Sequence, residues 1–254
     1  MDTRPIGVFD SGMGGLTCVR QMIRLLPGED IVYFGDTGRV PYGGRSVETI
    51  VRYARQDVAF LRSFDLKAIV IACGTVSTTA MDVLKRENDL PILGVVQPAA
   101  KAAVEATKTG NIGVIGTKAT IRSGAYEAAI RALLPKAELT AKACPLLVPL
   151  VEDGRVLRGD LVTERVVEEY LAPVKAAGVD TLVLGCTHYP LLMDVISDYM
   201  GAGVTLIDTG EQAARAAASL LTEQNQLNDP TRAGLRRYYA SDSAEDFAAT
   251  AKLF

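Results

Sequence analysis

Short apolar runs alternate along the chain with longer segments in which apolar residues recur every three or four positions. The runs are rich in β-branched residues and predict buried strands. These strands are residues 6–9, 31–34, 68–72, 92–96, 112–115, 181–185, 204–207 and 236–240. The periodic segments predict helices at residues 16–26, 46–61, 76–87, 98–107, 123–134, 160–177, 190–199, 211–222 and 244–253. Residues 143–150 are interrupted by prolines and are predicted to be extended.

Strands separated by helices of this length favour parallel sheets with right-handed crossovers. A weak internal repeat is also present, because residues 6–10 (IGVFD) resemble residues 112–116 (IGVIG). We therefore expect an α/β fold of two similar domains related by an approximate two-fold axis, with mainly parallel sheets. The first domain would contain residues 1–97 plus 211–254, and the second residues 98–210. Ligands of such sheets bind beyond the carboxyl ends of the strands, so the active site is expected in the cleft between the domains.

Two cysteines occupy matching places in this repeat. Cys73 ends an apolar run in AIVIACGTVSTT (residues 68–79), and Cys186 ends another in LVLGCTHYPLL (residues 182–192). On opposite walls of one cleft they would form an acid/base pair, in which a thiolate removes a proton and a thiol donates one. The alternative is that a free cysteine packs as a small hydrophobic residue, and this interpretation is preferred for Cys18 and Cys144.

Three polar residues lie close in sequence to these predicted strand ends. His188, the only histidine, follows Cys186 by two residues, where it could stabilise the thiolate, bind a substrate carboxylate or serve only the structure. Asp10 and Ser11 open the segment DSGMGG between a strand and a helix. This segment is either a tight turn or a place where backbone amides bind a carboxylate. Asp10 could also assist a thiol during catalysis.

Further candidates surround the same positions. Thr75 and Thr187 follow the two cysteines and offer hydroxyl groups to a substrate. Tyr42 and Gly43 belong either to an ordinary turn or to a loop that closes over a small ligand. Glu152 has two interpretations, a surface carboxylate or a member of the site.

Composition narrows the class of protein. The 254 residues carry a net charge of −3 and have no long basic run, which argues against nucleic acid as a partner. The N-terminal segment is not predicted to be a signal peptide, and no apolar stretch approaches the ~20 residues that cross a bilayer. One histidine and four scattered cysteines give no metal-ligand spacing. A cytoplasmic protein with free thiols, no metal and no membrane partner is expected.

Six motifs in order resemble the glutamate racemases of the aspartate/glutamate racemase family. They are GVFDSGMGGLT, YFGDTGRVPYG, ACGT, VIGTKATIRSGAY, CPLLVPLVEDG and LGCTHYPLL, and they extend from residue 6 to about residue 210. The resemblance implies cofactor-independent interconversion of L- and D-glutamate at Cα, which supplies D-glutamate for peptidoglycan synthesis. It also implies a homodimer.

Carried over position by position, the resemblance makes Cys73 and Cys186 the acid/base pair. Cys73 would take the proton from D-glutamate and Cys186 from L-glutamate. The positions matched around the substrate are Asp10, Ser11, Tyr42, Gly43, Thr75, Thr187 and His188, with Asp10 and His188 also expected to serve catalysis. Gly74 stands where the family usually has asparagine. A backbone contact to the substrate survives this change, and a side-chain amide contact does not.

Three other functions remain open from the sequence. One is a related racemase, chiefly for aspartate. Another is an amino-acid sensor or carrier on the same scaffold, suggested by Gly74. The third is a thiol-redox protein that uses Cys73 and Cys186.

Overall fold

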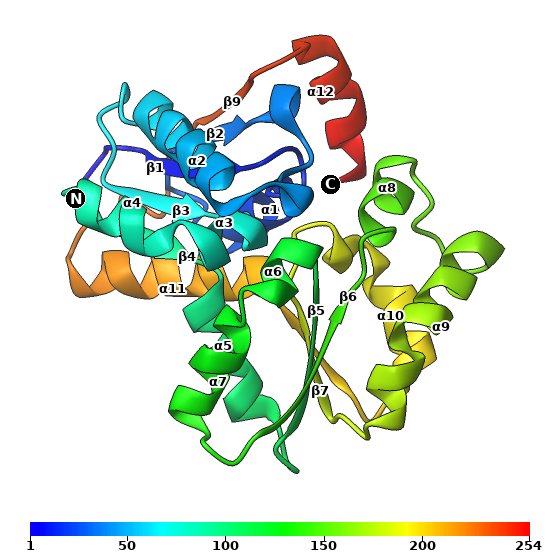
Figure 1. The fold of residues 1–254 in the computed structure, drawn as a ribbon. Coiled ribbons are helices and arrows are strands. Elements are labelled where there is room, and N and C mark those ends of the chain that lie inside the picture. The colour runs from blue at the N-terminus through cyan, green and yellow to red at the C-terminus, as the bar shows by residue number, and fades with distance from the viewer.

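Two separate parallel sheets form the two lobes of the computed structural model, which describes residues 1–254 (Figure 1). The first sheet has the order β4-β3-β1-β2-β9, with β1 (Ile6–Asp10), β2 (Ile31–Gly35), β3 (Ala68–Ile71), β4 (Ile92–Gly94) and β9 (Arg236–Ala240). The second has the order β6-β5-β7-β8, with β5 (Asn111–Gly116), β6 (Glu138–Ala143), β7 (Thr181–Leu184) and β8 (Thr205–Asp208). All strand pairs are parallel.

The two sheets share one topology. In the first sheet β1 lies between β2 and β3, and in the second β5 lies between β6 and β7. β4 and β8 then follow β3 and β7 at corresponding edges, and only β9 has no counterpart. The expected α/β fold with two similar halves is therefore confirmed. The division into residues 1–97 with 211–254 and residues 98–210 stays a prediction, which this distribution of strands supports.

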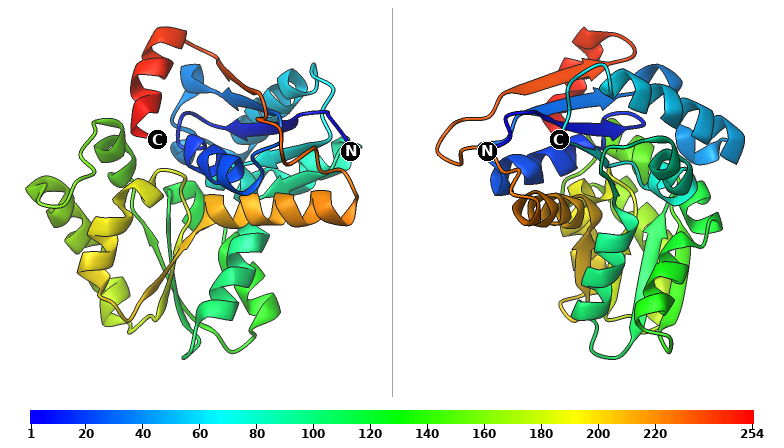
Figure 2. Two further views of the ribbon diagram at one scale, coloured as in Figure 1. Left: turned by 180° about the vertical axis from the view of Figure 1, so that it is seen from behind. Right: turned by 90° about the vertical axis from the view of Figure 1, so that its left-hand side faces the viewer.

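Helices cover both sheets and join the lobes. They are α1 (Leu16–Leu25), α2 (Val47–Leu61), α3 (Gly74–Thr79), α4 (Met81–Glu87), α5 (Val96–Ala106), α6 (Lys118–Arg122), α7 (Ala125–Leu133), α8 (Leu147–Glu152), α9 (Leu161–Ala176), α10 (Met193–Met200), α11 (Thr209–Glu223) and α12 (Ala244–Thr250), with short 3₁₀ turns η1 (Thr37–Arg39), η2 (Tyr42–Gly44), η3 (Tyr189–Leu192) and η4 (Ala251–Leu253). α11 runs between the lobes and packs against both α1 and α5 (Figure 2). None of the helices is both long and apolar enough to cross a membrane.

The buried strands explain the apolar runs of the sequence. Every residue of β1, β2, β3 and β7 is buried. Successive side chains of a strand point to opposite faces, and in β1 Val8 packs into the core beneath α1 and α11, whereas Phe9 packs into the core beneath α2. Strands covered on both faces read as continuous apolar runs rather than as alternating ones.

The prediction that residues 143–150 are extended is wrong. β6 ends at Ala143, and α8 begins at Leu147. Pro149 is the third residue of α8, where the backbone nitrogen has no intrahelical acceptor, so a proline is tolerated there. The helix predicted at residues 76–87 is divided at Ala80 into α3 and α4, and α6, which precedes the helix predicted at 123–134, is not among the predicted elements.

A buried ion pair ties distant parts of the first lobe together. Lys67 Nζ lies 2.5 Å from Glu29 Oε2, and the two side chains are 0% and 2% exposed. Lys67 Nζ also donates to the carbonyl oxygens of Asp2 and Gln226, both at 2.8 Å. Glu29 Oε1 accepts from the backbone nitrogen of Asn228 at 2.7 Å. This pair therefore joins the N-terminal segment to the segment that leads into β9.

We expect Lys67→Met to lower the free energy of unfolding by about 3–5 kcal/mol, because the change leaves Glu29 buried without its counter-charge. Urea unfolding followed by circular dichroism measures the loss. Lys101→Met is the control, since Lys101 is 73% exposed and lies 3.9 Å from Glu105. It should change stability by no more than about 0.5 kcal/mol. Equal losses in the two variants would contradict a special role for the buried pair.

Candidate active site

Asp10 and Cys73 lie at the carboxyl ends of two neighbouring strands of the first sheet. β1 and β3 pair in register, with Phe9 opposite Ile71. Asp10 is the last residue of β1, and Cys73 follows shortly after the end of β3. Cys73 is the residue that precedes α3, and its thiol donates to Ser11 Oγ at 3.2 Å. Asp10, Ser11 and Cys73 are thus collected at one edge, as the sequence predicts for ligand-binding ends of parallel strands.

The turn that carries Cys73 meets the turn that carries Cys186. A Cβ atom at Gly74 would lie 2.4 Å from the carbonyl oxygen of Gly185, so no side chain fits between the two backbones. Gly74 follows the first cysteine directly, and Gly185 precedes the second. Cys73 and Cys186 therefore approach one place from different lobes.

A second contact between the lobes holds Thr187 and His188 in the same place. Thr17 Oγ1 donates to the carbonyl oxygen of Thr187 at 3.0 Å. A Cβ atom at Gly14 would lie 2.1 Å from Thr187 Oγ1 and 2.5 Å from His188 Nδ1. The glycine-rich turn after β1 is thus packed against the second cysteine's neighbours, and Gly14 has to be glycine for this packing.

Cys186 belongs to a chain of polar contacts with His188 and Glu152. Cys186 Sγ lies 3.9 Å from His188 Nδ1, and His188 Nε2 lies 3.1 Å from Glu152 Oε1 at the end of α8. Burial lowers the pKa of His188, but its hydrogen bonds with Cys186 and Glu152 outweigh burial and raise that pKa to about 10. At neutral pH His188 is an imidazolium that places positive charge beside the Cys186 sulfur. This contact with His188 favours the interpretation of Glu152 as a member of the site, which stays a prediction.

Cys73 has the opposite surroundings. Burial and the nearby carboxylate of Asp10 raise the pKa of Cys73 to about 12, so this sulfur carries a proton at neutral pH. Burial also raises the pKa of Asp10. Asp10 Oδ2 accepts from the backbone nitrogen of Gly12 at 3.0 Å, whereas Oδ1 is buried without a hydrogen-bond partner in the protein. A buried acceptor of this kind is suited to a ligand's ammonium group.

Thr75, Tyr42 and Gly43 lie on one further side of the same region. Thr75 Oγ1 is 3.0 Å from Thr117 Oγ1, which comes from the second lobe. A Cβ atom at Gly43 would lie 2.8 Å from Cβ of Thr117, so η2 also packs across the boundary. The Tyr42 hydroxyl is engaged with Asp36 and Asp57, which leaves the backbone of η2 as the part that can face a ligand.

Two residues near the site carry no role in the sequence-based interpretation. Thr117 bonds Thr75 across the lobes, and Tyr126 is buried with its hydroxyl unpartnered. Its ring lies beside the turn that carries Cys186, since a Cβ atom at Gly185 would be 3.3 Å from Tyr126 Cε2. Burial, with the charges of Cys186 and Cys73, raises the pKa of Tyr126. Both residues belong to the motif VIGTKATIRSGAY, which is the sequence feature that could have identified them as neighbours of the site.

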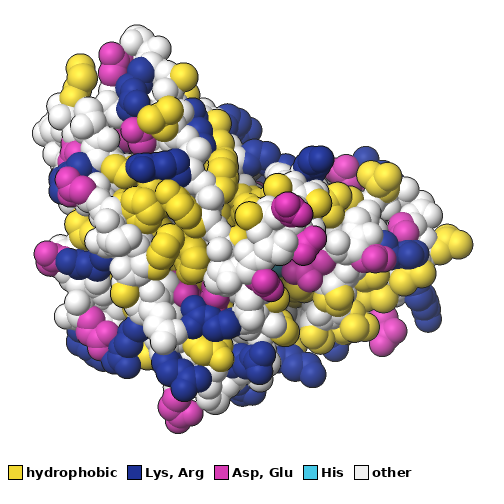
Figure 3. Space-filling view, turned by 90° about the horizontal axis from the view of Figure 1, so that it is seen from above, with side chains coloured by type: hydrophobic (Ala, Val, Ile, Leu, Met, Phe, Trp, Pro, Cys, Tyr) yellow, Lys and Arg dark blue, Asp and Glu magenta, His cyan; other side chains and the backbone are white.

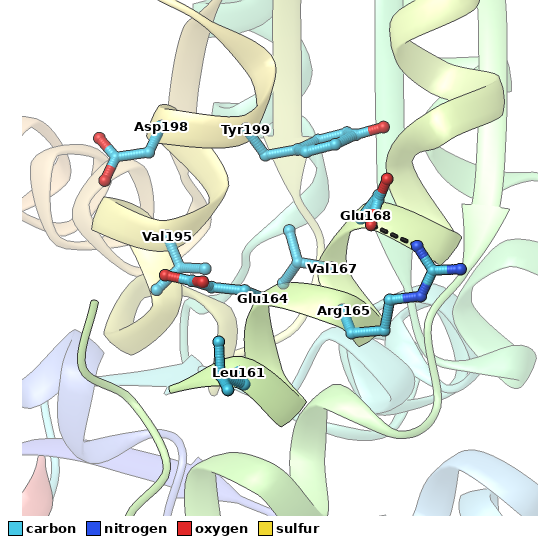
Figure 4. Close-up of a pocket in the computed structure, with 8 residues that line it drawn as sticks. All are labelled: Leu161, Glu164, Arg165, Val167, Glu168, Val195, Asp198 and Tyr199. Carbon is cyan, nitrogen blue, oxygen red and sulfur yellow. Dashed lines mark hydrogen bonds and ion pairs between the residues drawn. The ribbon is translucent and has the colours of Figure 1, made fainter. Parts of the chain in front are cut away.

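The surface hollow between α9 and α10 lies apart from this region. It is lined by Leu161, Glu164, Arg165, Val167, Glu168, Val195, Asp198 and Tyr199 (Figure 4). No residue of the predicted site lines it, and its Arg165–Glu168 ion pair is exposed. Acidic and basic side chains are interspersed on the face seen from above, without one continuous basic area (Figure 3).

Comparison with known proteins agrees with the geometry. The Asp/Glu/Hydantoin racemase family model matches residues 6–217. The glutamate racemase of Streptococcus gordonii is 47% identical over 99% of this chain and 95% of its own length. A glutamate racemase isoform from Bacillus anthracis superposes with a TM-score of 0.95 at 38% identity, covering 99% of this chain and 94% of that one. The glutamate racemase of Francisella tularensis, solved in complex with D-glutamate, gives 0.91 at 38% identity over 100% and 94%. The chain therefore belongs to the Asp/Glu/Hydantoin racemase family, and within it to the glutamate racemases.

Proposed function

We propose that this protein interconverts L- and D-glutamate by moving a proton at Cα between Cys73 and Cys186. The observation that carries the proposal is the contact between Gly74 and Gly185, which brings the two cysteine-bearing turns together from separate lobes. A substrate held between two thiols can lose a proton on one face and gain one on the other. Such proton transfer by positioned groups accelerates a reaction by about 10²–10⁴-fold for each group.

The different charges near the two sulfurs support a different enantiomer as the substrate from which each cysteine removes the proton. With L-glutamate, the Cys186 thiolate beside the His188 imidazolium takes the Cα proton, and the Cys73 thiol delivers its own proton to the opposite face. The C–H bond broken and the C–H bond formed balance, and Cys73 is left as the thiolate and Cys186 as the thiol. This is the state that D-glutamate requires, with Cys73 as the base.

The remaining site residues would bind the substrate and stabilise the carbanion. Asp10 Oδ1, buried and unpartnered, suits the α-ammonium group. The hydroxyls of Ser11, Thr75 and Thr187, with backbone amides, suit the two carboxylates. Donors arranged in advance stabilise charge that develops in the transition state, and they do so without reorganisation. Since Gly74 has no side chain, any contact there comes from its backbone.

We also infer that the protein acts in the cytoplasm, as a homodimer, and supplies D-glutamate for peptidoglycan synthesis. All four cysteines are free, which suits a reducing compartment. Light scattering of the purified protein tests the assembly, with an expected mass about twice the 27.1 kDa of one chain. A mass of one chain would contradict the dimer and leave the racemase proposal untouched.

Both thiols should be required for racemisation. Proton NMR of the wild-type protein with L-glutamate in D₂O should show loss of the Cα proton signal while D-glutamate forms. Cys73→Ser and Cys186→Ser should each lower kcat at least about 10³-fold, because a hydroxyl is a far weaker acid than a thiol and rarely ionises to act as a base. Cys18→Ser is the control, since Cys18 lies in the core beneath α11. Full activity in either of the first two variants would rule out the mechanism.

His188 should matter more for one direction of the reaction than for the other. His188→Asn removes the imidazolium beside Cys186, and a hydrogen bond to a charged group contributes about 1.5–3 kcal/mol, or about ten- to a hundredfold in rate. The enantiomers have equal free energies, so kcat/KM must fall equally in both directions, and kcat is the quantity to compare. We expect kcat to fall more for L-glutamate than for D-glutamate. Equal losses of kcat would indicate a general binding role instead.

The contact between the lobes at Gly74 should be required for full activity. Gly74→Ala places a Cβ atom 2.4 Å from a backbone oxygen that cannot move aside cheaply, so the two turns must separate. A misplacement of about 1 Å can cost up to about a hundredfold in rate, and we expect kcat/KM to fall about ten- to a hundredfold. Gly44→Ala is the matched control, because nothing lies within 4 Å of a Cβ atom there. Unchanged kinetics in Gly74→Ala would show that the approach of the backbones is dispensable.

A further inference from the structure

A buried ionisable cluster beneath η2 takes no part in the proton transfer described above. The carboxylate–tyrosine cluster consists of Asp36, Arg39, Tyr42 and Asp57. Asp36 follows β2, Arg39 and Tyr42 lie on η1 and η2, and Asp57 projects from α2. Asp36, Tyr42 and Asp57 are each no more than 1% exposed.

The hydrogen bonds of the cluster require one more hydrogen than its donors supply. Tyr42 Oη contacts Asp36 Oδ2 and also lies 2.9 Å from Asp57 Oδ2. A phenol has a single hydrogen, so it can donate to only one of these carboxylates. Arg39 does not resolve the conflict, because its Nη2 binds the other oxygen of Asp57, at 2.5 Å. Two acceptors therefore face one phenolic oxygen with one hydrogen between them.

Asp36 is the better acceptor of the Tyr42 hydrogen. Its Oδ2 lies 2.6 Å from Arg39 Nε, and its Oδ1 accepts from Ser241 Oγ at 2.7 Å. Asp36 thus has a guanidinium beside one oxygen and a hydroxyl donor on the other. Asp57 Oδ2 has only the Tyr42 oxygen as a partner, and the oxygen of a phenol can accept a hydrogen bond.

We propose that Asp57 holds a proton that fixes η2 beside the substrate, with Asp57 donating to Tyr42 Oη and Tyr42 donating to Asp36. Asp57 is then a positioning residue for the racemase site. The proposal rests on the proposed function, because it assumes that the backbone of Tyr42 and Gly43 binds the substrate.

The cluster reaches the site through two routes. The backbone nitrogen of Asp36 donates to the carbonyl oxygen of Asp10 at 3.1 Å. On the other side, Gly43 packs against Thr117, which bonds Thr75. A shift of Tyr42 would therefore move groups on both sides of the bound substrate.

Loss of the Asp57 proton would disrupt this arrangement. The ionisable groups facing Asp57 are Asp36, Arg39 and Tyr42, so an ionised Asp57 leaves two buried carboxylates with one guanidinium. The neighbours of Arg39 add no further negative charge, since Gln56 and the Tyr53 ring flank it. Burial and the charge of Asp36 raise the pKa of Asp57 to about 7, although Tyr42 and Arg39 act in the opposite direction. The proton is thus lost as pH rises through about 7.

Asp57→Asn tests the proposal, because an amide supplies the missing hydrogen at every pH. The amide oxygen of the variant side chain can still accept from Arg39, and its nitrogen can donate to Tyr42. KM for glutamate, measured from about pH 6 to about pH 8.5, should rise more steeply in the wild type, approaching about tenfold per pH unit relative to Asp57→Asn above pH 7. The ratio of kcat values should stay constant, because both proteins keep the same thiols.

Asp65→Asn is the matched control, since the Asp65 side chain is 86% exposed. It should follow the wild-type KM profile. A wild-type KM profile that coincides with that of Asp57→Asn would overturn the proposal.

Two readouts do not depend on activity. The folded pKa of Asp57 is raised above its ordinary value of 3.8, so folded protein binds this proton more tightly than unfolded protein does. The wild type should lose stability relative to Asp57→Asn as pH rises from about 4 to about 7, and the difference in Tm should then level off. In the wild type, the Asp57 carboxyl carbon should titrate near pH 7 by NMR, and titration near its ordinary value would overturn the proposal without any variant. Absence of racemisation with these two results intact would contradict the proposed function alone.

Discussion

The close approach of two peptide backbones, at Gly74 and Gly185, is the constraint on which the site depends. Each glycine adjoins a cysteine, so in the proposed mechanism the separation of the backbones limits how near the two thiols come to the substrate. Gly185 is itself confined from behind, where a Cβ atom would lie 2.6 Å from the carbonyl oxygen of Ile115. Gly14 plays the same part against Thr187. At both glycines the main chain of one lobe packs directly against the other lobe, so small errors in lobe position are transmitted to the groups beside the two cysteines.

Equivalent strands deliver the two thiols, yet their electrostatic surroundings differ. β3 and β7 occupy the same place in their sheets. Cys73 lies beside the carboxylate of Asp10, which opposes a second negative charge, whereas Cys186 lies beside the imidazolium of His188, which favours one. Two sheets of the same topology thus place unlike neighbours beside their cysteines. The resting protein holds one protonated sulfur and one sulfur beside a positive charge, which is a suitable starting point for transfer in one direction.

The sequence predicts the parts of the fold that are buried on both faces. β1, β3 and β7 are continuous apolar runs because helices cover both of their sides. β6 is absent from the predicted strands because it is a partly exposed edge strand that carries Glu138, Thr140 and Lys142. The prediction for α8 failed for a local reason, since a proline in a first helical turn resembles a proline in an extended segment.

In the site, too, local sequence patterns identify some residues, whereas contacts between distant parts of the chain are not visible in the sequence. That Cys73 and Cys186 come together could be predicted because each ends an apolar run, and the positions of Asp10 and His188 could be predicted because they adjoin strand ends. Thr117 lies within one of the six motifs, but its contact with Thr75 could not be predicted, since it joins lobes whose placement no local pattern encodes. Asp57 lies among the buried residues Ala54, Val58 and Leu61 of α2, and nothing in the helical spacing identifies its partners on η1 and η2.

The path of the chain has a consequence for biosynthesis. All strands of the second sheet lie within residues 111–208, whereas β9, the last strand to be made, pairs with β2 near the start of the chain. On the ribosome the second lobe can complete its sheet while β2 is still an open edge. Open edges are sites of unwanted pairing with other chains. The nascent first lobe is therefore the aggregation-prone half of the molecule until β9 emerges, and chaperone dependence should follow the synthesis of that strand.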